Sequence, residues 1–270
     1  MKSVWMASAV FALAVPASAQ QFSAPSKSDS PQSATMSTDS SPRDQALDRA
    51  ALAMIHKEFE DAATIYKSLL RDTPNDAVLW NRLGIAYQQQ DMFKEALKSY
   101  QHAAKADTKS GDAWNNMGTI YFQQRRWDKA VRSYKKAIKL SPSSATFYSN
   151  MGIAYLNNKH VPEAFAAFQK ALELDPEVFE HRGRVGTIIQ SHSATDSGAF
   201  YFLLAKSYAE SKNAERCAFY LRKARDEGYT GIERAKTDPD FVPMLNDATI
   251  RNILGLPELP GAPPKPTGIG

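Results

Sequence analysis

Apolar residues recur along the middle of the chain at the spacing of one helix face. Trp114, Met117, Gly118 and Tyr121, for example, stand at positions i, i+3, i+4 and i+7. On a helix of 3.6 residues per turn, such residues form one continuous stripe. Prolines that stop a helix, such as Pro142, follow at the ends of the helical stretches. The pattern predicts amphipathic helices that alternate with short turns.

The apolar pattern repeats every 34 residues. Seven positions keep similar residues over three consecutive units: Trp80, Trp114 and Tyr148; Leu83, Met117 and Met151; Gly84, Gly118 and Gly152; Tyr87, Tyr121 and Tyr155; Ala96, Ala130 and Ala164; Tyr100, Tyr134 and Phe168; Ala103, Ala137 and Ala171. This order resembles the tetratricopeptide repeat (TPR), which has the same period and the same succession of Trp, Leu, Gly, Tyr, Ala, Phe and Ala. Weaker matches extend the resemblance on both sides.

The resemblance implies an all-α fold, a right-handed superhelical α-solenoid of about five helical hairpins. In this register the hairpins occupy residues 43–76, 77–110, 111–144 and 145–178, a shifted fifth occupies 198–231, and a cap helix closes the array in 232–255. The glycine of each unit would cost a lone helix about 1 kcal/mol relative to alanine. We therefore expect its missing side chain to let the partner helix pack close. Because one hairpin cannot bury its stripe alone, stability has to come from its neighbours.

The segments outside the repeats differ in composition. Residues 1–19 combine one positive charge, an apolar run and a final A-x-A, and are predicted to be a signal peptide that is cleaved after Ala19. The run is shorter than the roughly 20 residues of a membrane span, so a cleaved signal is favoured over an uncleaved anchor. No stable membrane insertion is expected after cleavage. The Ser/Pro-rich linker 20–42 and the Pro/Gly-rich tail 256–270 are predicted to be disordered. Residues 179–197, where the register breaks, are a connector or loop, and the expected location is the periplasm or the outside of the cell.

The charge of the chain argues against one class of partner. Its 33 Lys and Arg residues against 29 Asp and Glu give a formal net charge of +4, and the basic residues alternate with acidic ones along the helices. A protein that binds nucleic acid usually gathers its basic residues on one face. No nucleic-acid partner is therefore expected.

No spacing of reactive residues points to catalysis. The histidines show neither the H-x3-H nor the H-E-x-x-H spacing of zinc sites, and no phosphate-binding loop, nucleophile elbow or C-x-x-C pair occurs. Cys217 is the single cysteine and stands where the other units place alanine, so an inert buried thiol is predicted and a reactive thiol is the alternative. We expect no enzyme activity, no cofactor, no metal and no small-molecule substrate.

The TPR resemblance also implies a binding surface, because first helices line a concave wall in that family. The corresponding residues here are Asn81, Arg82, Ile85, Gln88, Asp112, Asn115, Asn116, Thr119, Phe122, Ser149, Asn150, Ile153 and Leu156. Asparagine amides on such a wall can hydrogen-bond the backbone of an extended peptide, although Asn116 and Asn150 also stand where asparagine is common in ordinary TPR sequences. Only Arg82 among these residues is cationic, so no clamp for a C-terminal carboxylate is expected.

The partners expected for this chain are other proteins or peptides. The preferred function is an exported TPR scaffold that mediates protein–protein interaction through its concave groove and assembles or chaperones envelope or secreted proteins. The alternative is an obligate structural subunit of an outer-membrane, pilus or secretion complex. Arg182 and Arg184 would add a basic contact if the connector folds over the groove. Otherwise the connector only changes the direction of the superhelix.

Overall fold

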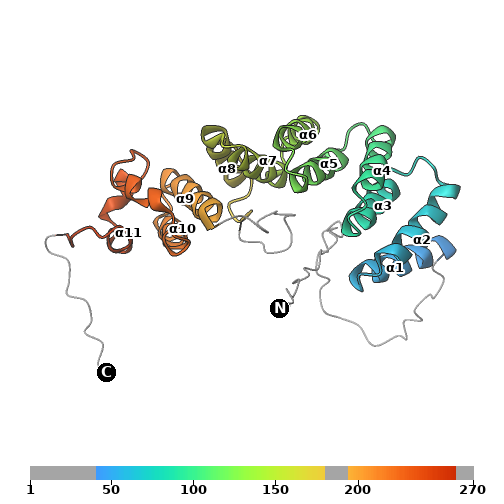
Figure 1. Ribbon diagram of the computed structural model, residues 1–270, viewed down its shortest axis with the longest axis horizontal. Helices are drawn as coiled ribbons and strands as arrows, with labels where there is room; N and C mark the ends of the chain where they lie inside the picture. The colour runs from blue at the N-terminus through green and yellow to red at the C-terminus, as the bar shows by residue number, and fades with distance from the viewer. Residues whose placement is uncertain (1–40, 180–193, 260–270) are drawn as a thin grey trace, which may run out of the picture. The chain divides into compact units, whose positions relative to one another are not determined.

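The described part of the chain is entirely helical. The computed structural model describes residues 41–179 and 194–259, and no strand occurs among them (Figure 1). The helices are α1 (Pro42–Ile55), α2 (Phe59–Asp72), α3 (Ala77–Gln89), α4 (Phe93–Ala106), α5 (Asp112–Gln123), α6 (Trp127–Leu140), α7 (Ala145–Asn157), α8 (Val161–Leu174), α9 (Ala194–Glu210), α10 (Ala214–Asp226), the 3-10 helices η1 (Thr230–Lys236) and η2 (Val242–Asn246), and α11 (Ala248–Ile253). The predicted all-α class is confirmed.

The helices form two compact units that divide within α5, after Asn116. In the first unit α1 packs on α2, α2 on α3 and α3 on α4. In the second unit α6 packs on α7, α7 on α8, α8 on α9 and α9 on α10. Each unit has its own apolar core, built around residues such as Tyr66 and Leu79 in the first and Tyr134 and Phe168 in the second. Consecutive packed pairs of helices are the arrangement that the 34-residue pattern predicts.

Several predicted segments lie wholly or partly outside the described residues. They are the signal segment 1–19, nearly all of the linker 20–42, most of the connector 179–197 with Arg182 and Arg184, and the tail 256–270 after residue 259. The last linker residue, Pro42, is the first residue of α1, and α9 begins at Ala194, before the expected start of the fifth hairpin at residue 198. Among the described helices, none is long and apolar enough to cross a membrane.

A turn with a left-handed residue joins the two helices of several hairpins. Lys57, Asp91, Arg125, Lys159 and Lys212 have φ between 56° and 65°. The first four stand 34 residues apart, like the apolar positions. At each of these turns the chain reverses within a few residues, as where the amide of Met92 donates to the carbonyl of Tyr87 at 3.0 Å. Such a conformation costs a residue with a side chain roughly 1–2 kcal/mol, so packing of the two helices has to hold it.

Each of three hairpins holds an aromatic ring against a glycine. A Cβ atom on Gly84 would lie 2.5 Å from Cε1 of Tyr100, and Gly118 and Gly152 face Tyr134 and Phe168 in the same way. All three rings are 0% exposed, so they have no free space to retreat into. The glycine therefore sets how closely the two helices of the hairpin approach.

We expect Gly84→Ala to destabilise the first unit. Overpacking a filled core costs about 1–3 kcal/mol, whereas the better helix propensity of alanine returns at most about 1 kcal/mol. Urea unfolding should show a net loss on the order of 1 kcal/mol. The same substitution in a Tyr100→Leu background serves as control, because leucine leaves room for the methyl group. An equal loss in both backgrounds would contradict a clash between these two residues.

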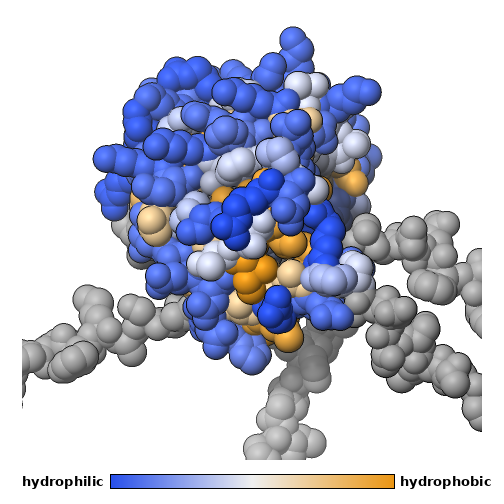
Figure 2. Space-filling model, turned by 90° about the vertical axis from the view of Figure 1, so that its right-hand side faces the viewer, coloured by the Kyte–Doolittle hydropathy of each residue, from blue (hydrophilic) through white to orange (hydrophobic). Residues whose placement is uncertain are grey.

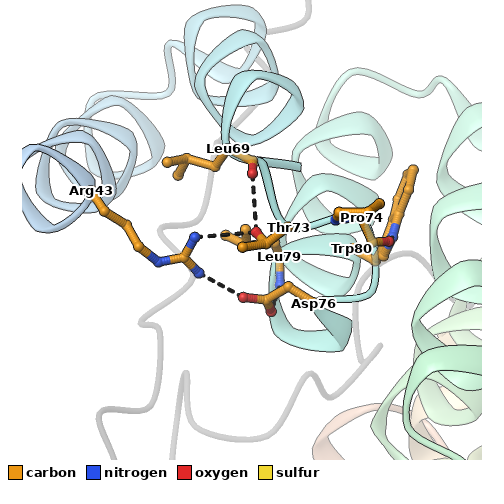
Figure 3. Close-up of polar contacts among 7 residues, drawn as sticks. All are labelled: Arg43, Leu69, Thr73, Pro74, Asp76, Leu79 and Trp80. Carbon is orange, nitrogen blue, oxygen red and sulfur yellow. Dashed lines mark hydrogen bonds and ion pairs between the residues drawn. The ribbon is translucent and has the colours of Figure 1, made fainter. Parts of the chain in front are cut away.

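A polar contact fastens α1 to the start of α3 (Figure 3). The Arg43 guanidinium donates to the Asp76 carboxylate at 2.7 Å and to the Thr73 hydroxyl at 3.2 Å, and that hydroxyl donates to the Leu69 carbonyl at 3.0 Å. The other carboxylate oxygen of Asp76 caps α3 by accepting from the amide of Leu79 at 2.9 Å. Asp76 therefore both starts a helix and ties the preceding hairpin to it.

Two substitutions of Asp76 separate these roles. Asp76→Ala removes the cap and the ion pair and should cost about 1–2 kcal/mol of unfolding free energy. Asp76→Asn keeps a good cap acceptor and loses only the charge, so its cost should stay below about 1 kcal/mol, like that of Arg43→Ala. Urea unfolding of the three variants tests the order. Equal losses for the Ala and Asn variants would show that the ion pair, and not the cap, matters.

Candidate protein-interaction site

The first helices present part of the predicted binding surface. On α3 the side chains of Asn81, Arg82, Ile85 and Gln88 are half-buried. On α5 Asp112 is exposed, and Asn115, Asn116 and Thr119 are half-buried. These residues remain within reach of a partner.

Asparagine side chains connect the two helices on this surface. The Asn116 amide donates to Oδ1 of Asn81 at 2.9 Å, and the Asn115 amide donates to Oδ1 of Asn116 at 3.3 Å. An asparagine amide can make up to four hydrogen bonds, so these contacts do not saturate Asn81 and Asn116. The result is a short row of oriented amides beside Arg82, which can present both donors and acceptors to a peptide backbone.

Two other predicted residues bond within their own hairpins. The Tyr100 hydroxyl donates to Oε1 of Gln88 at 2.8 Å, and the hydroxyls of Thr119 and Tyr134 are 3.3 Å apart. Both tyrosines are otherwise buried, and burial raises the pKa of each phenol above its ordinary value. Gln88 and Thr119 therefore satisfy the polar end of a core ring as well as bordering the surface.

The predicted surface does not continue openly along α7. Ser149, Asn150, Ile153 and Leu156 are 0–8% exposed, and Phe122 on α5 is 3% exposed. Ile153 and Leu156 belong to the same apolar cluster as Phe200 and Leu203, and Phe122 packs on Trp127 with ring centroids 4.8 Å apart. These five side chains contribute to packing and offer almost no area to a guest. Their positions in the 34-residue repeat indicate the face of the helix on which they lie, but not whether other residues cover that face.

A groove that the sequence reasoning did not identify opens on another face of α3. Its floor is apolar and is formed by Leu70 of α2 with Trp80, Leu83 and Tyr87 of α3. The space above it measures about 420 Å³, within the range of ligand sites in proteins. Successive residues of an α-helix turn by about 100°, so this face points away from Asn81, Arg82 and Ile85.

Cations dominate the rim of this groove. The rim carries three cations, Lys67 and Arg71 of α2 and Lys98 of α4, but only one carboxylate, that of Glu95. Across the described residues, Lys67 and Lys98 enter no ion pair, and Arg71 donates to the Ser68 hydroxyl at 3.1 Å. A sequence signal was present: Arg71 recurs as Lys105 and Lys139 at the 34-residue spacing. Alternation with acidic residues made these positions resemble an ordinary solvated surface.

The indole of Trp80 is fixed within the groove. Its Nε1 donates to the carbonyl of Pro74 at 2.8 Å, and its ring stacks on His102 with centroids 4.4 Å apart at 17°.

Exposed apolar residues occur elsewhere on the first unit too, at Leu52, Ile55 and Val78. Figure 2 shows a group of hydrophobic residues near the lower centre of one face, with mostly hydrophilic residues around it. Such concentration is typical of proteins that bind others.

Three family models match the repeat region of this chain. A family model described as TPR repeat matches residues 118–159, and two described as tetratricopeptide repeat match 145–178 and 77–110. Among solved structures, a crystal structure of MamA is 20% identical and has a TM-score of 0.48 over 70% of this chain and 95% of that one. MamA from residue 41 to its end, from Desulfovibrio magneticus RS-1, is 17% identical, with a TM-score of 0.48 over 73% and 97%.

A third solved structure is that of YrrB, described as a TPR protein with an unusual peptide-binding site. It is 22% identical, with a TM-score of 0.45 over 72% of this chain and 91% of that one. A search of curated proteins finds no match.

The described residues bear on two kinds of reactive site, a metal centre and a free thiol. They hold no group of three or more His, Cys, Asp or Glu side chains that could bind a metal. Cys217 is buried as predicted, at 0% exposure on α10. Burial, and then the negative charge of Asp247, raise the pKa of its thiol to about 12. The thiol therefore stays protonated near neutral pH, where a thiolate would be needed for nucleophilic chemistry.

The raised thiol pKa predicts a loss of stability in alkali. In the unfolded chain the thiol titrates near pH 8.5, so the folded state keeps the proton that the unfolded state releases. The stability that this provides is complete below about pH 8.5 and is lost as the pH rises toward 12. As the pH rises from 7.5 to 9.5, the free energy of unfolding measured in urea should fall by about 1.4 kcal/mol more for the wild type than for Cys217→Ala. Equal losses, or rapid labelling of the native thiol at pH 7.5, would contradict the burial.

Proposed function

We propose that this tetratricopeptide-repeat protein is an interaction module that holds a segment of another protein along α3 and α5. The family follows from residues 77–110 and 118–178, which match tetratricopeptide-repeat models. The row of amides Asn81, Asn116 and Asn115 beside Arg82 carries this proposal. An extended peptide exposes unpaired backbone N–H and C=O groups. Side-chain amides supply partners for both, and Arg82 adds a charged donor.

Binding without catalysis fits the surroundings of this row. The asparagines offer no group that takes or gives a proton near neutral pH, and the side chains beside them are half-buried. Hydrogen bonds to a backbone give affinity with little dependence on the partner's sequence, and pockets for side chains add selectivity. The module would thus recognise an exposed, extended segment.

The proposed setting is the periplasm or the outside of the cell, where the module would assemble or chaperone envelope or secreted proteins. The apolar run and the A-x-A sequence that ends at Ala19 support export and cleavage there. Fractionation of native cells distinguishes this role from that of an obligate subunit. A free pool in the soluble envelope fraction supports the module, whereas constant stoichiometry in one membrane complex would indicate the subunit.

Site-specific photocrosslinking tests the binding row. We introduce a photoreactive amino acid at Arg82 or Asn115 and, as control, at the exposed Arg222 on α10. Irradiation of cells that make the full chain should give the same discrete adducts from both first-helix positions and not from Arg222. Asn116→Ala should reduce the adduct yield at Arg82 several-fold, because it removes the amide that bridges the helices. No adducts, or equal adducts from Arg222, would exclude α3 and α5 as the binding surface.

A further inference from the structure

The groove between α2, α3 and α4 is a second recognition surface, distinct from the amide row. We propose that it binds an acidic segment of a partner protein, with an aromatic or aliphatic side chain seated on the apolar floor and neighbouring Asp or Glu carboxylates on the cationic rim. The proposal does not depend on the amide row, because the two surfaces lie on different faces of α3 and share no residue.

The floor selects an apolar side chain. Leu70 and Leu83 are buried beneath the groove and offer no polar atom from their side chains. The indole N–H of Trp80 is already bonded to Pro74, so the ring offers the groove an apolar surface held in place. A preformed pocket that accepts one anchor side chain loses little conformational entropy on binding.

The rim selects negative charge beside that anchor. The groove is lined by three cations from two helices, Lys67, Arg71 and Lys98, and by a single carboxylate, that of Glu95. Since Lys67 and Lys98 have no ion-pair partner among the described side chains, a carboxylate there gains attraction without breaking an existing pair. The exposed position of both lysines keeps the cost of desolvation small.

A peptide fits these features better than a nucleic acid does. Nucleic-acid sites combine a stripe of phosphate contacts with exposed aromatic platforms on which bases stack. Here one face of the Trp80 ring is already stacked on His102, so the ring offers no open platform on both sides for bases. An apolar anchor between flanking carboxylates uses the floor and the rim together.

Binding of synthetic peptides to the full chain tests the proposal. The probe is a fluorescein-labelled peptide, Gly-Asp-Glu-Phe-Leu-Glu-Asp-Gly, and fluorescence anisotropy reports its affinity. One comparison peptide carries Asn and Gln in place of Asp and Glu, and another carries Ala in place of Phe and Leu. We expect each comparison peptide to bind roughly tenfold more weakly or worse. Equal affinity for all three peptides would overturn the proposal, as would absence of binding by the first.

Charge variants locate the binding to the groove. The groove variant combines Lys67→Glu and Lys98→Glu, and the control combines Lys139→Glu and Arg222→Glu, exposed residues that are not part of the groove. Both change the net charge equally, and far-ultraviolet circular dichroism checks their helix content. The groove variant should lose about tenfold or more in affinity for the acidic peptide, and the control less than about twofold. Equal losses in the two variants would overturn the assignment.

Two further measurements keep the interpretation unambiguous. The milder pair Lys67→Gln and Lys98→Gln should give an intermediate loss, so the proposal remains testable if the charge reversal affects folding. A single-stranded oligonucleotide that competes with the peptide at equal or lower concentration would show a general polyanion site and overturn the peptide assignment. Photocrosslinking from Arg82 should be unchanged in the groove variant. Failure of the amide row and failure of this groove can therefore be told apart.

Discussion

The close approach of a glycine and an aromatic ring, found in three of the hairpins, is the constraint on which the rest of the structure depends. Gly84 and Tyr100 meet where an alanine methyl group would stand, and the same contact returns at Gly118 and Gly152. It sets how closely the two helices of such a hairpin approach. Because α3 is held in this way against α4, its two remaining faces are available to form two different surfaces.

The chemistry of those two surfaces follows from which helices meet there. The amide row lies where first helices adjoin, at Asn81 and Asn116, and its polar groups are oriented by bonds to one another. The groove lies where α2 and α4 flank the aromatic side of α3, so packing residues such as Trp80 remain partly open. A single helix thus contributes hydrogen-bonding capacity on one side and apolar area on the other.

The fold could be predicted from the sequence because its cause is periodic. Seven positions at a spacing of 34 residues determine the hairpins, and the alanine slot at Cys217 predicts a buried thiol. The α2–α4 groove escaped prediction because its residues come from helices of two hairpins, and Lys67 and Lys98 are 31 positions apart (98 minus 67). Position on a helix face likewise could not show that Ile153 and Leu156 are covered by neighbouring apolar residues.

The left-handed turn residues have a consequence for any fragment of this protein. Lys57, Asp91, Arg125, Lys159 and Lys212 hold backbone conformations that a glycine would adopt more easily. Each turn has an unfavourable backbone conformation, which is maintained only because the two helices that it joins pack on each other. A hairpin excised from its neighbours would keep the energetic cost of its turn and lose much of the apolar contact that offsets this cost. The smallest autonomous folding segment is therefore longer than one repeat.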